Sequence, residues 1–596
     1  MQVYEAPLRD MRFVLHELHG LERITALPAY AEATADVIDG VLDEAARLTQ
    51  EVILPLNASG DLEGCRLENG IVRTPKGFRE AYDTFREGGW PSLAGDPAFG
   101  GQGLPECVNK LVEEMICAAN LSFSLYPGLT HGAVKALESH GSAALKSMFL
   151  EKMTEGTWAG AMALTEAHCG TDLGLMRTKA IADDSGTYRL SGSKIFISAG
   201  DHDLTENIVH LVLARLPDAP PGIKGISMFL VPKLLPTEDG RPGARNGVIC
   251  TGLEHKMGLK ASATCQITYD DAKGWLVGAP HKGMQAMFTM MNEERLGVGI
   301  QGLGVASAAY QSAVAYAKER LQGRSLSGAK RPDLAADPII VHPDVRRMLM
   351  TMRANAEACR AVGIWVAQAV DLSKHAASPA ERRAAEDFTA LMTPVVKALF
   401  TDLGFEMASL GVQVYGGHGY IRDHGVEQFV RDARIAMLYE GTNGIQALDL
   451  VGRKMPAHMG RLLRPFFHPI SAYIEASRGR AALAPLVQGL ERAFGMLQLA
   501  TGQIAAAGLK DAEEAGAAAT DYLRLMGLVA MSYMLTRSAE IAQARVDATE
   551  DPDGFYAAKL ASARFFNDRV LPQASALYLA IKSGKASSMA LDEAAF

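Results

Sequence analysis

A change of hydrophobic period in the middle of the chain constrains its fold most. From about residue 161 to 280, short β-rich runs recur at 208–213, 226–231 and 264–269, and turn residues bound each run. Such runs are typical of short strands. On both sides apolar residues recur three and four positions apart, which is the period of a helix. The sequence therefore predicts a compact antiparallel β domain between helical domains.

The length of 596 residues predicts several domains, because a single hydrophobic core does not grow to this size. The fold class that we expect is mainly α with a central β domain. An apolar stripe from Leu483 to Leu497 needs a partner surface, which predicts that the end of the chain packs as helices. The expected parts are an N-terminal helical domain with a short extension (1–160), the β domain (161–280), a helical domain (281–455) and a C-terminal helical extension (456–596).

Charge and cysteine usage exclude several classes. A net charge of -9 disfavours a nucleic-acid binder, which needs a basic field. The seven cysteines are scattered without C-x-x-C spacing, which indicates a reducing compartment and neither a disulfide framework nor a metal site. The start lacks a secretory signal, and no run reaches the roughly 20 apolar residues of a membrane span. We expect a cytoplasmic protein without a transmembrane segment.

Two segments of the β region carry polar clusters. The segment 163–174 places hydroxyls and glycines close together, which suits the edge of a flat ring ligand but equally an ordinary strand-to-loop junction. In the segment 194–200, alternation predicts Phe196 and Ser198 on one face. An aromatic ring beside a hydroxyl could cover such a ligand, although core packing explains the pattern as well.

Two further segments lie in the second helical region. The segment 413–420 has three glycines in four residues, whose amides can approach phosphate oxygens, or which simply end a helix. His418 within it is expected to be a loop residue. In the segment 432–446, Glu440 follows an apolar run and precedes Gly441. A desolvated carboxylate there suits a base for a carbon acid, and the alternative is an acid at a helix start.

Taken in this order, the four segments resemble the acyl-CoA dehydrogenase family over about residues 40–455. The glycine loop 99–104 and the segments 256–262 and 276–284 are similar to the family as well. The sequence departs from the family pattern at Cys169, Leu175 and Gln428, and has Phe196 and Ser198 where Trp and Thr are frequent. The opening residues 4–15 and the C-terminal block resemble the large bacterial type.

The resemblance implies FAD-dependent oxidation of an acyl-CoA thioester to the trans-2-enoyl-CoA. Glu440 would be the catalytic base, and its backbone N–H would bind the thioester carbonyl together with a ribityl hydroxyl of FAD. Some members take their base from the position of Glu294, so this residue is the alternative base. We favour Glu440 because the motif Tyr439-Glu440-Gly441-Thr442 is intact.

The resemblance also implies the ligand contacts. Arg320 and the segment 413–417 would reach the FAD of a neighbouring subunit, which implies an obligate homo-oligomer, at least a dimer. An electron-transfer flavoprotein would accept the electrons. The implied FAD contacts are Thr165, Thr171, Phe196, Ser198, Arg320, Gln413, Gly416, Gly417, Thr442 and Gly444, and the implied substrate contacts are Thr171, Asn292, Arg295 and Gly441.

The sequence does not identify the acyl group of the substrate. The substrates of the large bacterial type include 3-(methylthio)propanoyl-CoA, an intermediate of dimethylsulfoniopropionate catabolism, whose product would be 3-(methylthio)acryloyl-CoA. The alternatives are a fatty acyl-CoA dehydrogenase for short, medium or long chains, an acyl-CoA oxidase, and a DNA-binding flavoprotein of the same superfamily. The last is disfavoured because the C-terminal block has equal numbers of basic and acidic residues.

Overall fold

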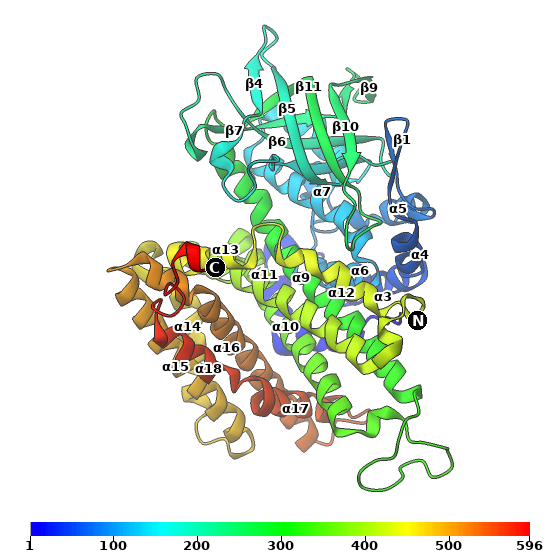
Figure 1. The fold of residues 1–596 in the computed structure, drawn as a ribbon, viewed down its shortest axis with the longest axis vertical. Helices are drawn as coiled ribbons and strands as arrows, with labels where there is room; N and C mark the ends of the chain where they lie inside the picture. The colour runs from blue at the N-terminus through cyan, green and yellow to red at the C-terminus, as the bar shows by residue number, and fades with distance from the viewer. Residues whose placement is uncertain (1) are drawn as a thin grey trace. The chain divides into compact units, whose positions relative to one another are not determined.

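The computed structural model describes residues 2–596, which form two compact units. The first, here called the helical unit, contains Met1–Ala46, Pro105–Ala118 and Val298–Phe596. The second, the β unit, contains Arg47–Leu104 and Ala119–Gly297. The expected fold class is confirmed, because the strands lie in the β unit and helices make up most of the rest (Figure 1).

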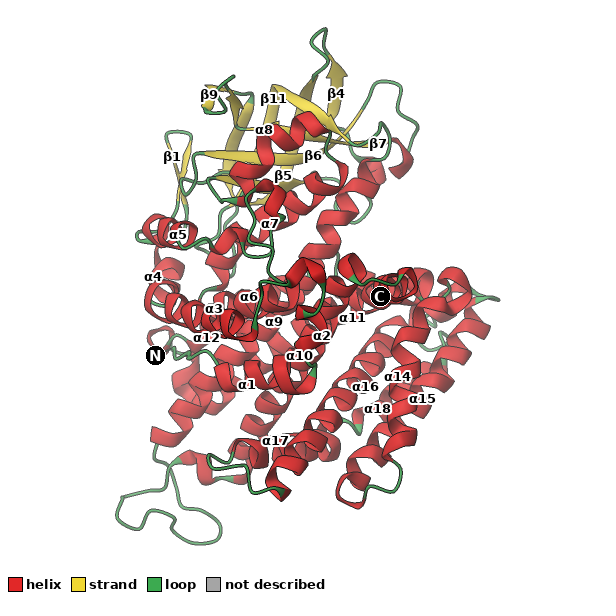
Figure 2. Cartoon of the chain, turned by 180° about the vertical axis from the view of Figure 1, so that it is seen from behind, coloured by secondary structure: helices red, strands yellow, loops and turns green. Residues whose placement is uncertain are grey.

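The strands of the β unit are the yellow elements of Figure 2. Seven of them form one sheet in the order β10-β11-β5-β4-β6-β3, with β7 pairing β11 and β6. The three predicted strand segments lie within β6, β7 and β11, so these predictions are confirmed. The sheet is mixed, however, because β3 runs parallel to β6, and the expectation of a wholly antiparallel domain is wrong for this pair. The two strands are separated by the β4–β5 hairpin, and such a long connection permits parallel pairing. The strands are β3 (Trp158–Ala163), β4 (Lys179–Ala182), β5 (Tyr188–Ser198), β6 (Asn207–Arg215), β7 (Ile226–Pro232), β10 (Val248–Leu253) and β11 (Thr264–Val277).

Helix α7 packs closely on this sheet. Asn120 caps its first turn by accepting a hydrogen bond from the Phe123 amide at 3.1 Å. On β3, a Cβ added at Gly160 would lie 2.5 Å from the Cβ of Ala133, so the glycine permits the close approach. The other elements of the β unit are α4 (Leu56–Glu63), β1 (Arg66–Glu68), β2 (Ile71–Arg73), α5 (Phe78–Glu87), α7 itself (Leu121–His140), α8 (Ala143–Thr154), β8 (Leu234–Pro236), β9 (Pro242–Arg245) and the first turns of α9 (Gly283–Glu319).

The helical unit packs long helices around α10 and α11. The apolar stripe predicted from Leu483 to Leu497 is buried on α15 and at its N-cap, Leu483, and α15 packs against α16 and α18, so this prediction is confirmed. One stretch, Pro379–Tyr420, is long and apolar enough to cross a membrane, but 78% of its most apolar window is buried inside the fold, as in a core helix. The helices are α1 (Leu8–Arg12), α2 (Glu22–Thr25), α3 (Ala35–Leu48), α6 (Glu106–Ala119), the remainder of α9, α10 (Pro343–His375), α11 (Pro379–Tyr415), α12 (Val426–Ala433), α13 (Asn443–Asp449), α14 (Arg464–Ser477), α15 (Ala484–Gly508), α16 (Ala512–Asp547), α17 (Phe555–Phe565) and α18 (Gln573–Ser583).

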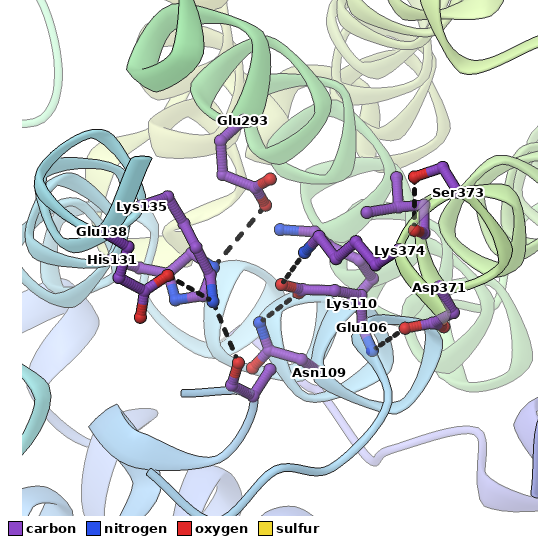
Figure 3. Close-up of polar contacts among 12 residues, drawn as sticks. Glu106, Asn109, Lys110, His131, Lys135, Glu138, Glu293, Asp371, Ser373 and Lys374 are labelled. Carbon is purple, nitrogen blue, oxygen red and sulfur yellow. Dashed lines mark hydrogen bonds and ion pairs between the residues drawn. The ribbon is translucent and has the colours of Figure 1, made fainter. Parts of the chain in front are cut away.

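Helix α6 is held at its start by a buried carboxylate of α10. Asp371 accepts hydrogen bonds from the amides of Glu106 and Cys107 at 2.7 and 3.1 Å (Figure 3). Tyr30 donates a third hydrogen bond to the same carboxylate at 2.8 Å. Burial, and then the neighbouring Glu106 carboxylate, raise the pKa of Asp371 to about 6. The amides satisfied in this way would otherwise be unpaired at a buried helix start.

A network of buried charges joins the N-terminal segment to the C-terminal extension within the helical unit. Arg360 on α10 forms ion pairs with Glu114 of α6, at 2.5 Å, and with Asp10 of α1. Lys559 on α17 pairs with Asp10 as well, and with Glu357 of α10 at 3.2 Å. Arg360 and Lys559 are each only 3% exposed, so the charges depend on one another for neutralisation.

Helices α9 and α11 cross at a pair of glycines, and we expect this crossing to reject a side chain. A Cβ at Gly302 would lie 2.3 Å from the carbonyl oxygen of Phe400, and one at Gly404 would lie 2.6 Å from that of Gly302. Gly302→Ala should therefore cost about 1–3 kcal/mol of unfolding free energy through overpacking, measured by chemical denaturation. The control is Gly502→Ala on α15, where nothing lies within 4 Å of the added Cβ. The control variant should be more stable than the wild type by about 0.5–1 kcal/mol. If Gly302→Ala were as stable as Gly502→Ala, the close packing of α9 on α11 at Gly302 would be contradicted.

Candidate functional site

The Glu440 segment is a strained turn of the helical unit. A short 3-10 helix, Arg434–Met437, precedes it, and α13 begins directly after it. Glu440 has φ of 57° and Gly441 of 86°, so two successive residues adopt the left-handed conformation. For a residue other than glycine, this costs on the order of 1 kcal/mol or more and persists only where the surroundings impose it, often at functional sites. The strain supports a functional role for Glu440.

Buried polar side chains fix the backbone of this turn. Gln446 donates hydrogen bonds to the carbonyl oxygens of Glu440 and Gly441, each at 3.1 Å. Lys397 on α11 donates to the carbonyl of Gly441 at 2.9 Å and to Oδ1 of Asn443 at 2.8 Å. Lys397 and Gln446 are fully buried. Thr442 is the N-cap of α13, its hydroxyl accepting from the amide of Ile445 at 3.3 Å.

A second group in the helical unit surrounds the glycine loop 413–420. Gln413, Gly416 and Gly417 are exposed, and an added Cβ at either glycine would meet nothing within 4 Å. Tyr316 stacks on Tyr415 with ring centroids 4.0 Å apart, and its hydroxyl lies 2.9 Å from Nδ1 of His418. These contacts join the loop to the last turns of α9, where the exposed Arg320 follows. His418 lies on a short 3-10 helix, Gly416–Tyr420, that ends α11, and not on an irregular loop as expected.

In the β unit, Thr165 and Thr171 lie on the loop after β3, and a buried ion pair ties this loop to β5. The carbonyl of Thr165 accepts a hydrogen bond from the Ile195 amide at 2.9 Å. Glu166 lies 2.9 Å from the ammonium of Lys194, which is fully buried. Burial alone would raise the pKa of Glu166, but Lys194 and hydrogen bonds donated from Thr178 and the Arg177 amide lower it to about 2. Thr171 itself is exposed.

This ion pair predicts an acid-sensitive β unit. Because its folded pKa lies below the ordinary 4.5, ionised Glu166 contributes stability at neutral pH that is lost as pH falls from about 4.5 towards 2. Glu166→Gln should cost about 1–3 kcal/mol at neutral pH, since Lys194 loses its counter-charge. The difference from the wild type should shrink over the same pH range in thermal unfolding. Glu206→Gln, an exposed change in the same unit, should show no such trend.

Phe196 lies at a β-bulge, which the alternation rule did not anticipate. The pairing of β5 with β11 shifts between Ile197, opposite Cys265, and Lys194, opposite Ile267. The extra residue lets Phe196 adopt φ of 60° and leaves its ring 59% exposed, whereas Lys194 is buried. The bulge changes the direction of Phe196 relative to Lys194, whereas a shared face for Phe196 and Ser198 stays a prediction. An exposed aromatic ring on a strained backbone, next to the half-buried Ser198, favours ligand contact over core packing.

The alternative base, Glu294, is buried on α9 within the β unit. Its Oε1 lies 2.4 Å from the position of a Cβ at Gly132 of α7, so the absence of a side chain there makes room for the carboxylate. Next to this pair, Nε2 of His131 lies 3.6 Å from Oε1 of Glu293 (Figure 3). Arg295 is buried and donates weakly to the exposed Asn292 at 3.5 Å. Glu294 thus fills space between α7 and α9.

Within the helical unit, the structure groups several of the predicted residues. Glu440, Gly441 and Thr442 share one turn and Gly444 lies in the first turn of α13. Tyr316, one helical turn before Arg320, contacts His418 in the segment that carries Gln413, Gly416 and Gly417. The sequence reasoning missed the residues that hold the predicted segments, namely Lys397, Gln446, Glu166 and Lys194. A single lysine inside the apolar run 394–400 was a signal for Lys397, since a buried lysine requires acceptors.

Comparison with known proteins assigns the family. The chain matches the N-terminal, middle and C-terminal domains of acyl-CoA dehydrogenases at residues 40–157, 161–272 and 281–455, and an acetyl-CoA dehydrogenase C-terminal-like domain at 466–592. It is 44% identical to 3-methylmercaptopropionyl-CoA dehydrogenase of Ruegeria pomeroyi over 96% of this chain and 97% of that protein. It is 34% identical to a broad-specificity linear acyl-CoA dehydrogenase of Mycobacterium tuberculosis over 100% of both.

A solved structure, ACDH-11 of Caenorhabditis elegans, has the same fold with a TM-score of 0.76 at 21% identity, covering 96% of this chain and 92% of that one. Fold, domain matches and full-length relatives agree. The chain belongs to the acyl-CoA dehydrogenase family and is an FAD-dependent oxidoreductase that acts on acyl-CoA.

Proposed function

We propose that this enzyme oxidises 3-(methylthio)propanoyl-CoA to 3-(methylthio)acryloyl-CoA, with Glu440 as the base. The observation that carries the substrate is the 44% identity, over nearly the whole length of both chains, to an enzyme named for this acyl group. Identity to the broad-specificity linear acyl-CoA dehydrogenase is lower, at 34%. The strained backbone of Glu440 supports its choice as the base.

The described residues fit FAD. The exposed ring of Phe196 and the hydroxyl of Ser198 offer a flat surface and a polar group of the kind that an isoalloxazine ring needs. The open backbone at Gly416 and Gly417, with the exposed cation of Arg320 on the neighbouring helix end, suits the negatively charged diphosphate. We assign Thr165, Thr171, Thr442 and Gly444 to FAD contacts as well, and Gln413 to the FAD of the other subunit.

In the proposed reaction, the Glu440 carboxylate removes a proton from the carbon next to the thioester carbonyl. The amide of Glu440 donates a hydrogen bond to that carbonyl oxygen and stabilises the enolate charge as it develops. When bound, FAD supplies the acceptor for the hydride that leaves the β-carbon. Gly441 contributes backbone to the substrate site, and Thr171, Asn292 and Arg295 contact the CoA moiety.

The proposal includes the partners and the setting of the enzyme. An electron-transfer flavoprotein reoxidises the reduced cofactor. The enzyme works in the cytoplasm. It is a homodimer, because Arg320 and the loop 413–417 are assigned to the FAD of the other subunit. Analytical ultracentrifugation of the holoenzyme tests the dimer.

A panel of acyl-CoA substrates tests the proposed function. The purified holoenzyme is assayed with short, medium, long, branched, aryl and methylthio acyl-CoAs and an artificial electron acceptor. We expect 3-(methylthio)propanoyl-CoA to have the highest kcat/KM of the panel. Its value should exceed that of butanoyl-CoA by about 10-fold or more, the discrimination that one extra atom of the acyl chain can provide in a fitted pocket. A preference for linear acyl chains would overturn the substrate. Rapid reoxidation by air with peroxide release would instead identify an oxidase.

A further inference from the structure

We propose that Lys397 is a positioning residue for Glu440, and that it holds the strained turn in the one conformation that aims the carboxylate at the substrate. The inference rests on the proposed role of Glu440 and adds a residue 43 positions away in the chain, on α11, to the machinery of proton removal.

The burial of Lys397 requires that its ammonium be paired. The side chain is 0% exposed, and its Nζ donates to the carbonyl of Gly441 at 2.9 Å and to Oδ1 of Asn443 at 2.8 Å. Placing an ammonium inside a protein is costly unless fixed acceptors replace the lost water. Both of these acceptors lie within three residues of Glu440. The stabilisation of the buried ammonium therefore depends on the conformation of this turn.

The hydrogen bonds leave the turn a single arrangement. The carbonyl of Gly441 accepts from both Lys397 and Gln446, so both of its lone pairs are used. The carbonyl of Glu440 accepts from Gln446. Rotation of either peptide would break at least one bond to a buried donor. The Cα of Glu440 begins the first of these two peptides, so the two buried donors restrict the backbone on the C-terminal side of the base and with it the direction of its side chain.

The same polar group continues towards the C-terminal extension. Asn443 donates to Thr401 at 3.0 Å and to Asp402 at 2.6 Å. Arg524 of α16 is near Asp402 and donates to Glu406 at 2.9 and 3.2 Å. Helix α16 packs against both α11 and α13. The extension thus packs against the two helices that carry Lys397 and Asn443.

Lys397→Met removes the ammonium while keeping a side chain of similar length. In stopped-flow reduction of the FAD-loaded enzyme by its best acyl-CoA, we expect the limiting rate to fall about 100-fold, as for a misplaced catalytic group. The substrate concentration that gives half of the limiting rate should stay unchanged. The FAD content of the purified variant should stay unchanged as well. The kinetic isotope effect with α-deuterated substrate should rise, because proton removal becomes slower relative to the other steps. A purely structural role would not change this isotope effect.

Lys559→Met is the matched control, since Lys559 is also buried in the helical unit but pairs with Asp10 and Glu357. It should lower stability and leave the limiting rate and isotope effect as in the wild type. If Lys397→Met does not fold, the variant Gln446→Leu tests the positioning of the turn instead. This change removes both hydrogen bonds that Gln446 donates to the turn, together with an unpartnered acceptor, its Oε1, and leaves the Lys397 bond in place. It should slow reduction and raise the isotope effect in the same way.

Two failures are distinguishable. If acyl-CoA reduces the wild-type flavin and the Lys397 variant (or, where that variant does not fold, the Gln446 variant) keeps the wild-type rate and isotope effect, the positioning role is overturned and the proposed function stands. If no acyl-CoA reduces the wild-type flavin, the proposed function falls, and the positioning role falls with it.

Discussion

Glu440→Gln is expected to abolish bleaching of the flavin by acyl-CoA. Glutamine keeps the shape of the side chain but cannot accept the α-proton, so the rate of flavin reduction should fall by up to about 10⁴-fold, the upper range for a general base. The backbone contacts of the turn, from Gln446 and Lys397, do not involve the substituted carboxylate. FAD content and the visible spectrum of the oxidised enzyme should therefore be unchanged. Anaerobic titration with substrate gives the measurement.

Glu294→Gln is the matched control for this experiment. Glu294 is buried against Gly132 of α7 and does not lie on a strained turn. The variant should keep most of the flavin bleaching. If the two results are reversed, Glu294 is the base and the assignment of Glu440 is wrong.

Arg360→Met is expected to destabilise the protein more than any other change considered. Arg360 is 3% exposed and neutralises two carboxylates, Glu114 and Asp10. Its removal leaves buried carboxylates that have lost a counter-charge, which should cost about 3–5 kcal/mol of unfolding free energy. The loss should appear as a lower midpoint in chemical denaturation. The first elements to loosen should be α1 and α17, because Asp10 and Lys559 belong to the same network.

An exposed ion pair of the helical unit provides the comparison. Arg23 and Glu381 lie 2.7 Å apart, but their side chains are 60% and 42% exposed. Arg23→Met should therefore change stability by about 1 kcal/mol or less. If Arg360→Met and Arg23→Met lowered the unfolding free energy equally, burial would not explain the contribution of the Arg360 network to stability.

Much of the fold could be predicted from local patterns. The strands around 208–213, 226–231 and 264–269 and the buried stripe of α15 follow from hydrophobic period, and period depends only on neighbouring residues. The parallel pairing of β3 with β6 could not be predicted, because strand direction in a sheet depends on the path of the connection. The bulge at Phe196 likewise depends on the register with β11.

By itself, the sequence determined the family, the four motif segments and Glu440 as the first choice of base. Each motif segment is a run of contiguous residues, so local sequence is enough to identify it. Only the tertiary structure decided what holds the turn at Glu440 and Gly441. Lys397 lies on another helix and reaches the carbonyl of Gly441 through packing that no local pattern encodes. A buried ammonium is tolerated only where folding brings acceptors to it, so its role becomes visible once the helices are placed together.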